Sequence, residues 1–181
     1  MRSLNASSIP SVIAPTTWPS TSSDAVRNPR RTTGCSRANS AGHSARSILA
    51  RRGFNREDWT AWVNEASAPP VPGAVDYLDY VASRGVTVFY LTNRRVELEP
   101  ATRRNLEARG FPVRSDLDVV LTRNERPEWT RDKHSRRQWI RERFRVVQIL
   151  GDDLEDFVSV PPGTDADTRQ HLARQHADEW G

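Results

Sequence analysis

The chain has 181 residues, enough for one ordinary domain and too few for two large ones. Hydrophobic residues make up 36% of it, and no apolar run approaches the roughly 18 residues that span a bilayer. Its one cysteine, Cys35, excludes an intrachain disulfide framework and a cysteine-rich zinc site. Transmembrane proteins, disulfide scaffolds and zinc fingers are therefore excluded.

The formal net charge of +4 is unevenly distributed along the chain. Residues 1–50 hold six basic residues and one acid, whereas residues 51–181 hold 21 basic and 22 acidic residues. Residues 1–50 also contain 16 serines and threonines and no sustained amphipathic period. We therefore expect a disordered or aberrant basic leader over 1–50 and a folded domain over 51–181. The leader contains no apolar stretch of signal-peptide length, so the sequence assigns no compartment.

The elements expected after the leader alternate between helix and strand. The first helix carries Trp59, Trp62 and Val63 at i, i+3 and i+4, which gives it one apolar face. Residues 86–91 form a continuous β-branched and aromatic run, typical of a strand buried on both faces. The expected helices are 58–66, 74–84, 100–109, 131–143 and 165–179, and the expected strands are 86–91, 118–122 and 146–150.

Strands separated by helices of this length predict an α/β fold, in which a parallel sheet carries helices on both faces. In such sheets, ligands bind beyond the carboxyl ends of the strands. The first strand is followed by Thr92-Asn93-Arg94, and the third by the acidic stretch 151–157. These two segments are therefore the first candidates for a functional site.

The acidic stretch contains Asp152, Asp153, Glu155 and Asp156. Carboxylates this close together repel one another unless a cation neutralises them. Their oxygen ligands suit Mg²⁺, which takes one or two carboxylates together with waters and phosphate oxygens. The alternative is a solvated acidic turn in which Asp153 is the N-cap of a short helix.

Lys133 is the only lysine in the chain, against 26 arginines. A single lysine in so arginine-rich a sequence indicates a site that needs a compact ammonium rather than a guanidinium fork. The alternative is chance survival on a solvated helix. Thr92, at the end of an apolar strand, offers a hydroxyl and a backbone N–H for a phosphoryl oxygen.

The hydroxyl, the lysine and the acidic stretch, in this order, resemble motifs II, III and IV of the haloacid dehalogenase (HAD) superfamily of phosphatases. The resemblance is greatest to its acid phosphatases of the class B-like branch, which includes the lipoprotein-type 5′-nucleotidases. It covers about residues 54–158. The matching segments are 57–63, 72–75, 88–94, Thr102 with 105–106, 110–112, Lys133 with Arg136, and 151–157.

The resemblance implies a Rossmann-like fold and Mg²⁺-dependent hydrolysis of a phosphomonoester through an aspartyl-phosphate. By position, it implies that Thr92 binds the phosphoryl group and that Lys133 neutralises charge in catalysis. It also implies Mg²⁺ ligation by Asp152, with Asp156 as a supporting ligand and Asp153 as a further candidate.

The resemblance further places Asn93 and Arg94 beside the substrate. Trp59 and Trp62 are candidates for stacking a nucleotide or aromatic leaving group. The alternative for these two tryptophans is packing of an amphipathic helix. Members of the family are usually exported from bacteria.

Motif I of that superfamily, Asp-x-Asp-x-Thr at the end of an apolar strand, is missing from these 181 residues. Asp24 is the only acid before residue 57, and the expected position reads Arg31-Thr-Thr-Gly-Cys35. A frame or start error in the coding sequence is one hypothesis for this loss. The central motif I strand, between strands 86–91 and 145–150, is then absent or replaced by a leader segment such as 11–14.

Two interpretations of function follow. The first is an HAD-type acid phosphatase whose activity is impaired because its nucleophile is missing. The second is a non-catalytic remnant, or a protein that binds polyanions through its basic leader. The leader has no aromatic residue beyond Trp18 interleaved with its arginines, so we expect no specific nucleic-acid partner. The sequence fixes neither the substrate nor the oligomeric state.

Overall fold

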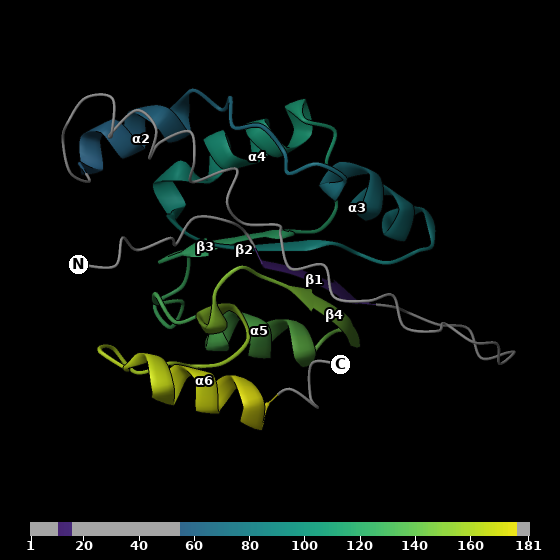
Figure 1. Cartoon of the computed structure of the whole chain (residues 1–181). Helices are drawn as coiled ribbons and strands as arrows, with labels where there is room; N and C mark the ends of the chain where they lie inside the picture. Colours follow the sequence, from purple (N-terminus) through teal and green to yellow (C-terminus); the bar gives the residue numbers. More distant parts are fainter. Residues whose placement is uncertain (1–10, 16–54, 177–181) are drawn as a thin grey trace, which may run out of the picture.

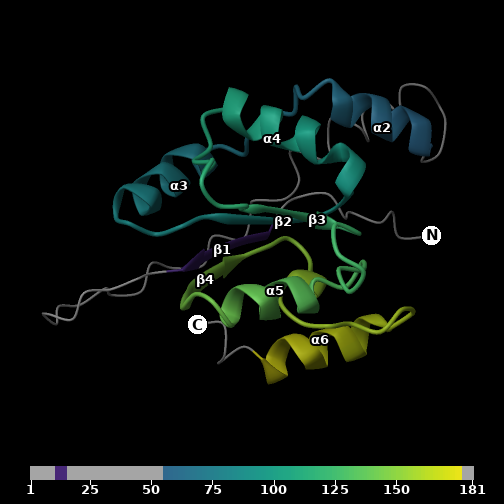
Figure 2. The ribbon, with the colours of Figure 1, turned by 180° about the vertical axis from the view of Figure 1, so that it is seen from behind.

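The computed structural model describes the backbone of residues 11–15 and, with side chains, residues 55–176. A four-stranded sheet has the order β3-β2-β1-β4. Helices α2, α3 and α4 cover one face of this sheet, and α5 and α6 lie on the other, so the fold has three layers (Figures 1 and 2). The expected α/β class, with helices on both faces, is confirmed.

The strands are β1 (Ser11–Pro15), β2 (Phe89–Arg95), β3 (Val120–Arg123) and β4 (Val146–Leu150). β2 pairs with β3 in parallel, and β1 pairs antiparallel with both β2 and β4. β2, β3 and β4 therefore run in the same direction, and their carboxyl ends lie at one edge of the sheet. The expectation of a parallel sheet holds for these three strands.

The direction of β1 makes the sheet mixed, which differs from the all-parallel expectation. β1 lies between β2 and β4, in the position where the sequence analysis expects the motif I strand to be absent or replaced by a segment such as 11–14, with Ser11 opposite Leu91 and Val12 opposite Leu150. A strand of either direction satisfies the backbone N–H and C=O groups of its neighbours, and the apolar pattern of a short segment does not fix its direction. The rest of the expected leader lies outside the described residues.

Two strand boundaries differ from the sequence expectation. β2 begins at Phe89 and continues through Arg95, so Thr92, Asn93 and Arg94 lie within the strand and not after it. The reason is that pairing with β3 resumes at Arg95, after a shift of register that follows Leu91. β3 begins two residues later than expected, at Val120.

The sequence explains where α2 and α4 begin. Asn55 caps α2 because its Oδ1 accepts hydrogen bonds from the N–H groups of Glu57 and Asp58, and Pro100 lies in the first turn of α4. The bounds are α2 Arg56–Asn64, α3 Ala74–Ser83, α4 Glu99–Ala108, α5 His134–Arg141 and α6 Ala166–Gln175. Two short 3₁₀ helices are η1 Val96–Leu98 and η2 Leu154–Asp156.

The main core lies where β2 and β3 meet the helices. Phe89, Leu91 and Leu121 are completely buried there, together with Ile140 of α5. β4 is only partly buried, and Val147 is exposed, whereas β3 at the other edge of the sheet is buried. In the described part of the chain, no helix combines the length and the apolarity that crossing a membrane requires.

Candidate active site

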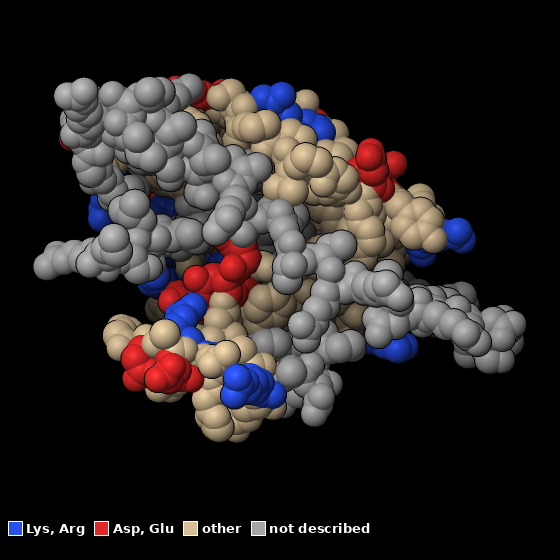
Figure 3. All heavy atoms as spheres, in the orientation of Figure 1, with Lys and Arg blue, Asp and Glu red and all other residues tan. Residues whose placement is uncertain are grey.

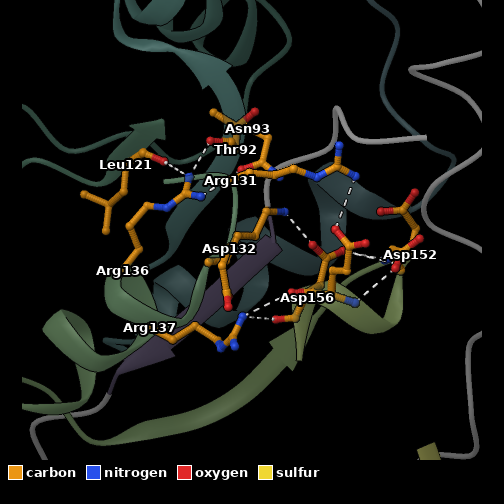
Figure 4. Close-up of polar contacts among 12 residues, drawn as sticks. Thr92, Asn93, Leu121, Arg131, Asp132, Arg136, Arg137, Asp152 and Asp156 are labelled. Carbon is orange, nitrogen blue, oxygen red and sulfur yellow. Dashed lines mark hydrogen bonds and ion pairs between the residues drawn. The ribbon is translucent and has the colours of Figure 1, made fainter. Parts of the chain in front are cut away.

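The carboxyl ends of β2, β3 and β4 meet the N-terminal end of α5 at one edge of the sheet (Figure 4). β2 brings Thr92 to this edge, the residue before α5 is Lys133, and the segment after β4 carries Asp152. The three residues expected to share a site thus come from three different elements.

Lys133 and Asp156 form a buried ion pair at the centre of this edge. The Lys133 Nζ donates to Asp156 Oδ1 at 2.5 Å, and both side chains are about 95% buried. Burial lowers the pKa of Lys133 from its usual value, while the Asp156 carboxylate opposes that shift. The only lysine of the chain is therefore buried at the strand ends, and the alternative of a solvated helix position is wrong.

The second oxygen of Asp156 organises the segment after β4. Its Oδ2 accepts hydrogen bonds from the backbone N–H groups of Asp152, at 3.0 Å, and Asp153, at 3.3 Å. This packing requires a residue without a side chain at Gly151, where an added Cβ would lie 2.4 Å from the Cβ of Asp156. Asp156 therefore joins Lys133 to the backbone that presents Asp152.

The environment of Asp152 raises the pKa of its carboxyl group. Partial burial, with the neighbouring Asp156 carboxylate as the next cause, raises its pKa to about 6. A carboxyl group with a raised pKa next to another acid is one that a bound cation stabilises in its charged form. Asp152 thus has the chemistry of a candidate cation ligand.

Asp153 has a structural role. It is the N-cap of η2, and its Oδ1 accepts from the N–H of Glu155 at 3.0 Å and from Arg169 of α6 at 2.7 Å. The alternative interpretation of Asp153 as a helix cap is confirmed. Across the described residues, no group of three or more acidic, histidine or cysteine side chains gathers in a way that could hold a metal ion.

Thr92 is completely buried at the end of the apolar part of β2. Its Oγ1 accepts from the N–H of Arg94 at 3.2 Å, and its carbonyl accepts from the guanidinium of Arg136 at 2.5 Å. The neighbouring Asn93 Oδ1 accepts from the same guanidinium at 2.8 Å. Thr92 and Asn93 therefore lie in one network with α5.

Arg94 points into a different environment from Thr92. Its guanidinium carbon lies 6.0 Å from the ring centre of Trp59 and 5.7 Å from that of Trp62, and its Nη1 donates to Thr102 at 3.1 Å. The two tryptophan rings contact each other with centres 5.0 Å apart and belong to one hydrophobic cluster. These contacts favour the packing interpretation of the tryptophans, and they place the Arg94 guanidinium against both rings.

Two site arginines had no role assigned from sequence. Arg136 is completely buried, and Arg137, which is 3% exposed, donates from Nη1 to the carbonyls of Glu155 at 3.2 Å and Asp156 at 3.1 Å. Their positions three and four residues after Lys133 place all three cations on one face of α5. That spacing is the signal that could have found Arg137, whereas Arg136 is already among the residues that carry the family resemblance.

Charge at the surface is mixed, as the near-neutral composition of residues 51–181 predicts. Acidic and basic side chains lie next to each other near the middle of the visible face, and neither sign dominates it (Figure 3). Arg131 Nη2, at 3.4 Å from Glu155 Oε2, and Arg169, at 2.7 Å from Asp153, are two such pairs beside the acidic segment.

Comparison with known proteins identifies the family. The family model described as HAD superfamily, subfamily IIIB (acid phosphatase), matches residues 39–175. A stem 31 kDa glycoprotein of soybean (Glycine max) is 26% identical over 106 residues, which cover 58% of this chain and 42% of that protein. The soybean stem 28 kDa glycoprotein is 25% identical over 109 residues, with the same two coverages.

Solved structures of the class C acid phosphatase from Bacillus anthracis are similar in fold. One superposes with a TM-score of 0.67 at 28% identity, and another, with tungstate bound, superposes with a TM-score of 0.66 at the same identity. Each alignment covers 77% of this chain and 56% of the Bacillus chain, so the chain spans about half the length of these relatives. The family match extends over three quarters of the sequence, and the chain belongs to the acid phosphatases of the HAD superfamily.

Proposed function

We propose that Thr92, Lys133 and Asp152, at the carboxyl ends of the strands, form a phosphate site of the acid-phosphatase type. We further propose that this polypeptide hydrolyses phosphomonoesters only in trace amounts. The observation that carries the proposal is the buried Lys133–Asp156 pair at the carboxyl ends of β2 and β4. A buried ammonium fixed in position stabilises negative charge on a neighbouring oxyanion far better than a solvated one does.

Thr92 supplies the hydrogen-bond donor of this site. Its Oγ1 accepts the N–H of Arg94, so the hydroxyl proton is directed elsewhere and can be donated to a phosphoryl oxygen. Asn93 and Arg94 follow on the same strand as substrate-side residues. Trp59 packs against Trp62, with its ring centre 6.0 Å from the Arg94 guanidinium, and it stays the candidate for stacking an aromatic leaving group such as that of a nucleotide.

Mg²⁺ is the expected metal, and Asp152 is the residue that fits it best. Its raised pKa and the adjacent acid make it the carboxylate whose charged form a divalent cation would stabilise. Asp156 is held by Lys133, and Asp153 by Arg169, so these two are supporting residues rather than principal ligands. When bound, the metal supplies charge neutralisation of the phosphoryl oxygens.

The absence of an Asp-x-Asp-x-Thr motif from these 181 residues supports the proposal of impaired hydrolysis. The family match begins at residue 39, downstream of residues 31–35, where the first aspartate motif is expected. β1 stands in the central position of the sheet, but it runs antiparallel and has Ser11 opposite Leu91. No acid occurs in Ser11–Pro15 to attack phosphorus or to protonate a leaving alcohol.

Anion-dependent thermal stabilisation tests the binding part of this proposal. Phosphate or vanadate with Mg²⁺ is expected to raise the melting temperature of the wild type, and Thr92→Val to weaken the apparent anion affinity at least tenfold. Thr122→Val is the matched control, because Thr122 is equally buried on β3 and donates its hydroxyl to Glu125 at 3.1 Å. Equal affinities in the two variants would contradict the role of Thr92.

Turnover of p-nitrophenyl phosphate tests the catalytic part. We expect the purified chain to be far slower than the class C acid phosphatase from Bacillus anthracis assayed under the same conditions. Turnover within tenfold of that enzyme would show that this polypeptide carries a working nucleophile.

A further inference from the structure

Arg136 donates four hydrogen bonds to groups at and beside the strand ends. It is completely buried on α5, one helical turn after Lys133. Its Nη1 donates to the carbonyl oxygens of Thr92, at 2.5 Å, and Leu121, at 3.4 Å. Its Nη2 donates to Asn93 Oδ1, at 2.8 Å, and to the carbonyl oxygen of Thr130, at 2.9 Å.

These four acceptors belong to three separate segments of the fold. Thr92 and Asn93 lie on β2, and Leu121 lies on β3 (Figure 4). Thr130 lies in the connection between β3 and α5 that leads to Lys133. A planar guanidinium with donors in a rigid fork can hold several acceptors at fixed angles, whereas the single ammonium of a lysine cannot. The side chain thus locks two strand ends to the start of α5.

An arginine at position 136 does not stabilise α5 as a helix. α5 has no acidic residue in its first turn, and cations at a helix N-terminus are opposed by the helix dipole. The hydrogen-bond acceptors of the buried Arg136 side chain are backbone carbonyls and an amide oxygen rather than carboxylates, and Asp132 and Glu125 act on its charge only from a distance. The buried Arg136 guanidinium therefore adds positive potential at the strand ends and lowers the stability of α5.

We infer that Arg136 is a positioning residue, which sets the Thr92 hydroxyl and the Lys133 ammonium at the separation that one phosphoryl group requires. It acts through backbone carbonyls and not by touching the ligand. The inference rests on the proposed phosphate site, because it assigns the residue that assembles that site.

Arg136→Lys tests the inference, with Ile140→Val as the control. Ile140 is completely buried on the same helix, so its truncation weakens the packing of α5 without removing a hydrogen bond to a strand end. Two quantities are measured at a temperature where both variants are folded. They are the hydrogen-exchange rates of peptides covering 89–95 and 128–134, and the tungstate dissociation constant in Mg²⁺ from calorimetry.

Arg136→Lys is expected to speed exchange in both peptides at least tenfold and to weaken tungstate binding at least tenfold, whereas Ile140→Val changes neither peptide selectively. Unchanged exchange in Arg136→Lys would overturn the inference whatever the affinity. Exchange that accelerates equally in Ile140→Val would also overturn it, because the effect would then be general loosening. If the wild type binds no tungstate, the proposed phosphate site is wrong. Faster hydrogen exchange in Arg136→Lys would then still show that Arg136 holds the strand ends, and unchanged exchange would show that it does not.

Discussion

The Nζ of Lys133 donates to the Oδ1 of Asp156 at 2.5 Å, which joins the start of α5 to the segment after β4 through a buried ion pair. The other carboxylate oxygen of Asp156 holds two backbone N–H groups of the same segment. One carboxylate therefore fixes both the cation and the backbone that carries Asp152. We therefore expect the stability and the ligand affinity of the proposed site to depend on Asp156.

The ion pair predicts strong energetic coupling between its partners. Lys133→Met or Asp156→Asn alone is expected to lower the free energy of unfolding by about 3–5 kcal/mol, because each leaves an uncompensated buried group. The double variant is expected to lose clearly less than the sum of the single losses. Urea denaturation of the four proteins measures the coupling, and additive losses would show that the pair is not formed in solution.

Gly151 predicts a steric effect on the same carboxylate. Alanine at this position would bring a Cβ within 2.6 Å of Asp156 Oδ2, so Gly151→Ala is expected to displace Asp156 and to lower stability by about 1–3 kcal/mol. Tungstate affinity should fall with it. Gly85→Ala is the control, because Gly85 has a positive φ but open space around its Cβ position, so it strains the backbone away from the site. Equal tungstate affinities in the two variants would contradict the packing of Gly151 on Asp156.

Asp152 predicts a pH dependence of stability in the absence of metal. Its pKa is raised from 3.8 to about 6 in the folded state, so the folded protein binds more protons than the unfolded chain between these values. The contribution of Asp152 to stability is therefore present below about pH 4 and is lost as the pH rises through 6.

Asp152→Asn removes that titration. The variant is expected to gain stability relative to wild type as the pH rises from 4 to 7, when both are unfolded with urea in the presence of a chelator. A stability difference between the two proteins that does not change with pH would contradict the raised pKa.

Substitution of Asp153 is expected to affect ligand binding less than substitution of Asp152. Its carboxylate caps η2 and pairs with Arg169, which is about one-third exposed, so the ion pair itself contributes only about 0–1 kcal/mol. Asp153→Asn is expected to keep the cap and to leave Mg²⁺-dependent tungstate affinity within threefold of wild type. Asp152→Asn, measured in the same way, should weaken it at least tenfold. The reverse order of the two variants would make Asp153 the principal metal ligand.

The sequence predicted the α/β class, the helices and the approximate strands, because these depend on periodicity and on caps such as Asn55. It also predicted that Lys133 is special, since a single lysine among 26 arginines is a compositional signal. It could not predict the direction of β1, because a short apolar segment satisfies its neighbours in either direction.

The hydrogen-bond partners of Arg136 were equally out of reach from sequence. Its four acceptors lie on segments up to 44 positions away, and three of them are backbone carbonyls that leave no mark on residue identity. The contacts of Asp153 were also not predictable from composition. Asp153 reads as a metal ligand from composition, yet local capping geometry and Arg169, 16 positions later, determine where its carboxylate lies.

Calorimetric titration with tungstate in Mg²⁺ tests most directly whether the strand ends form a phosphate site. We expect one saturable site per chain, competition by inorganic phosphate, and at least tenfold weaker binding in Lys133→Met measured under conditions where that variant is folded. Absence of saturable binding, or an affinity that neither phosphate nor the loss of the Lys133 ammonium changes, would contradict the proposed site.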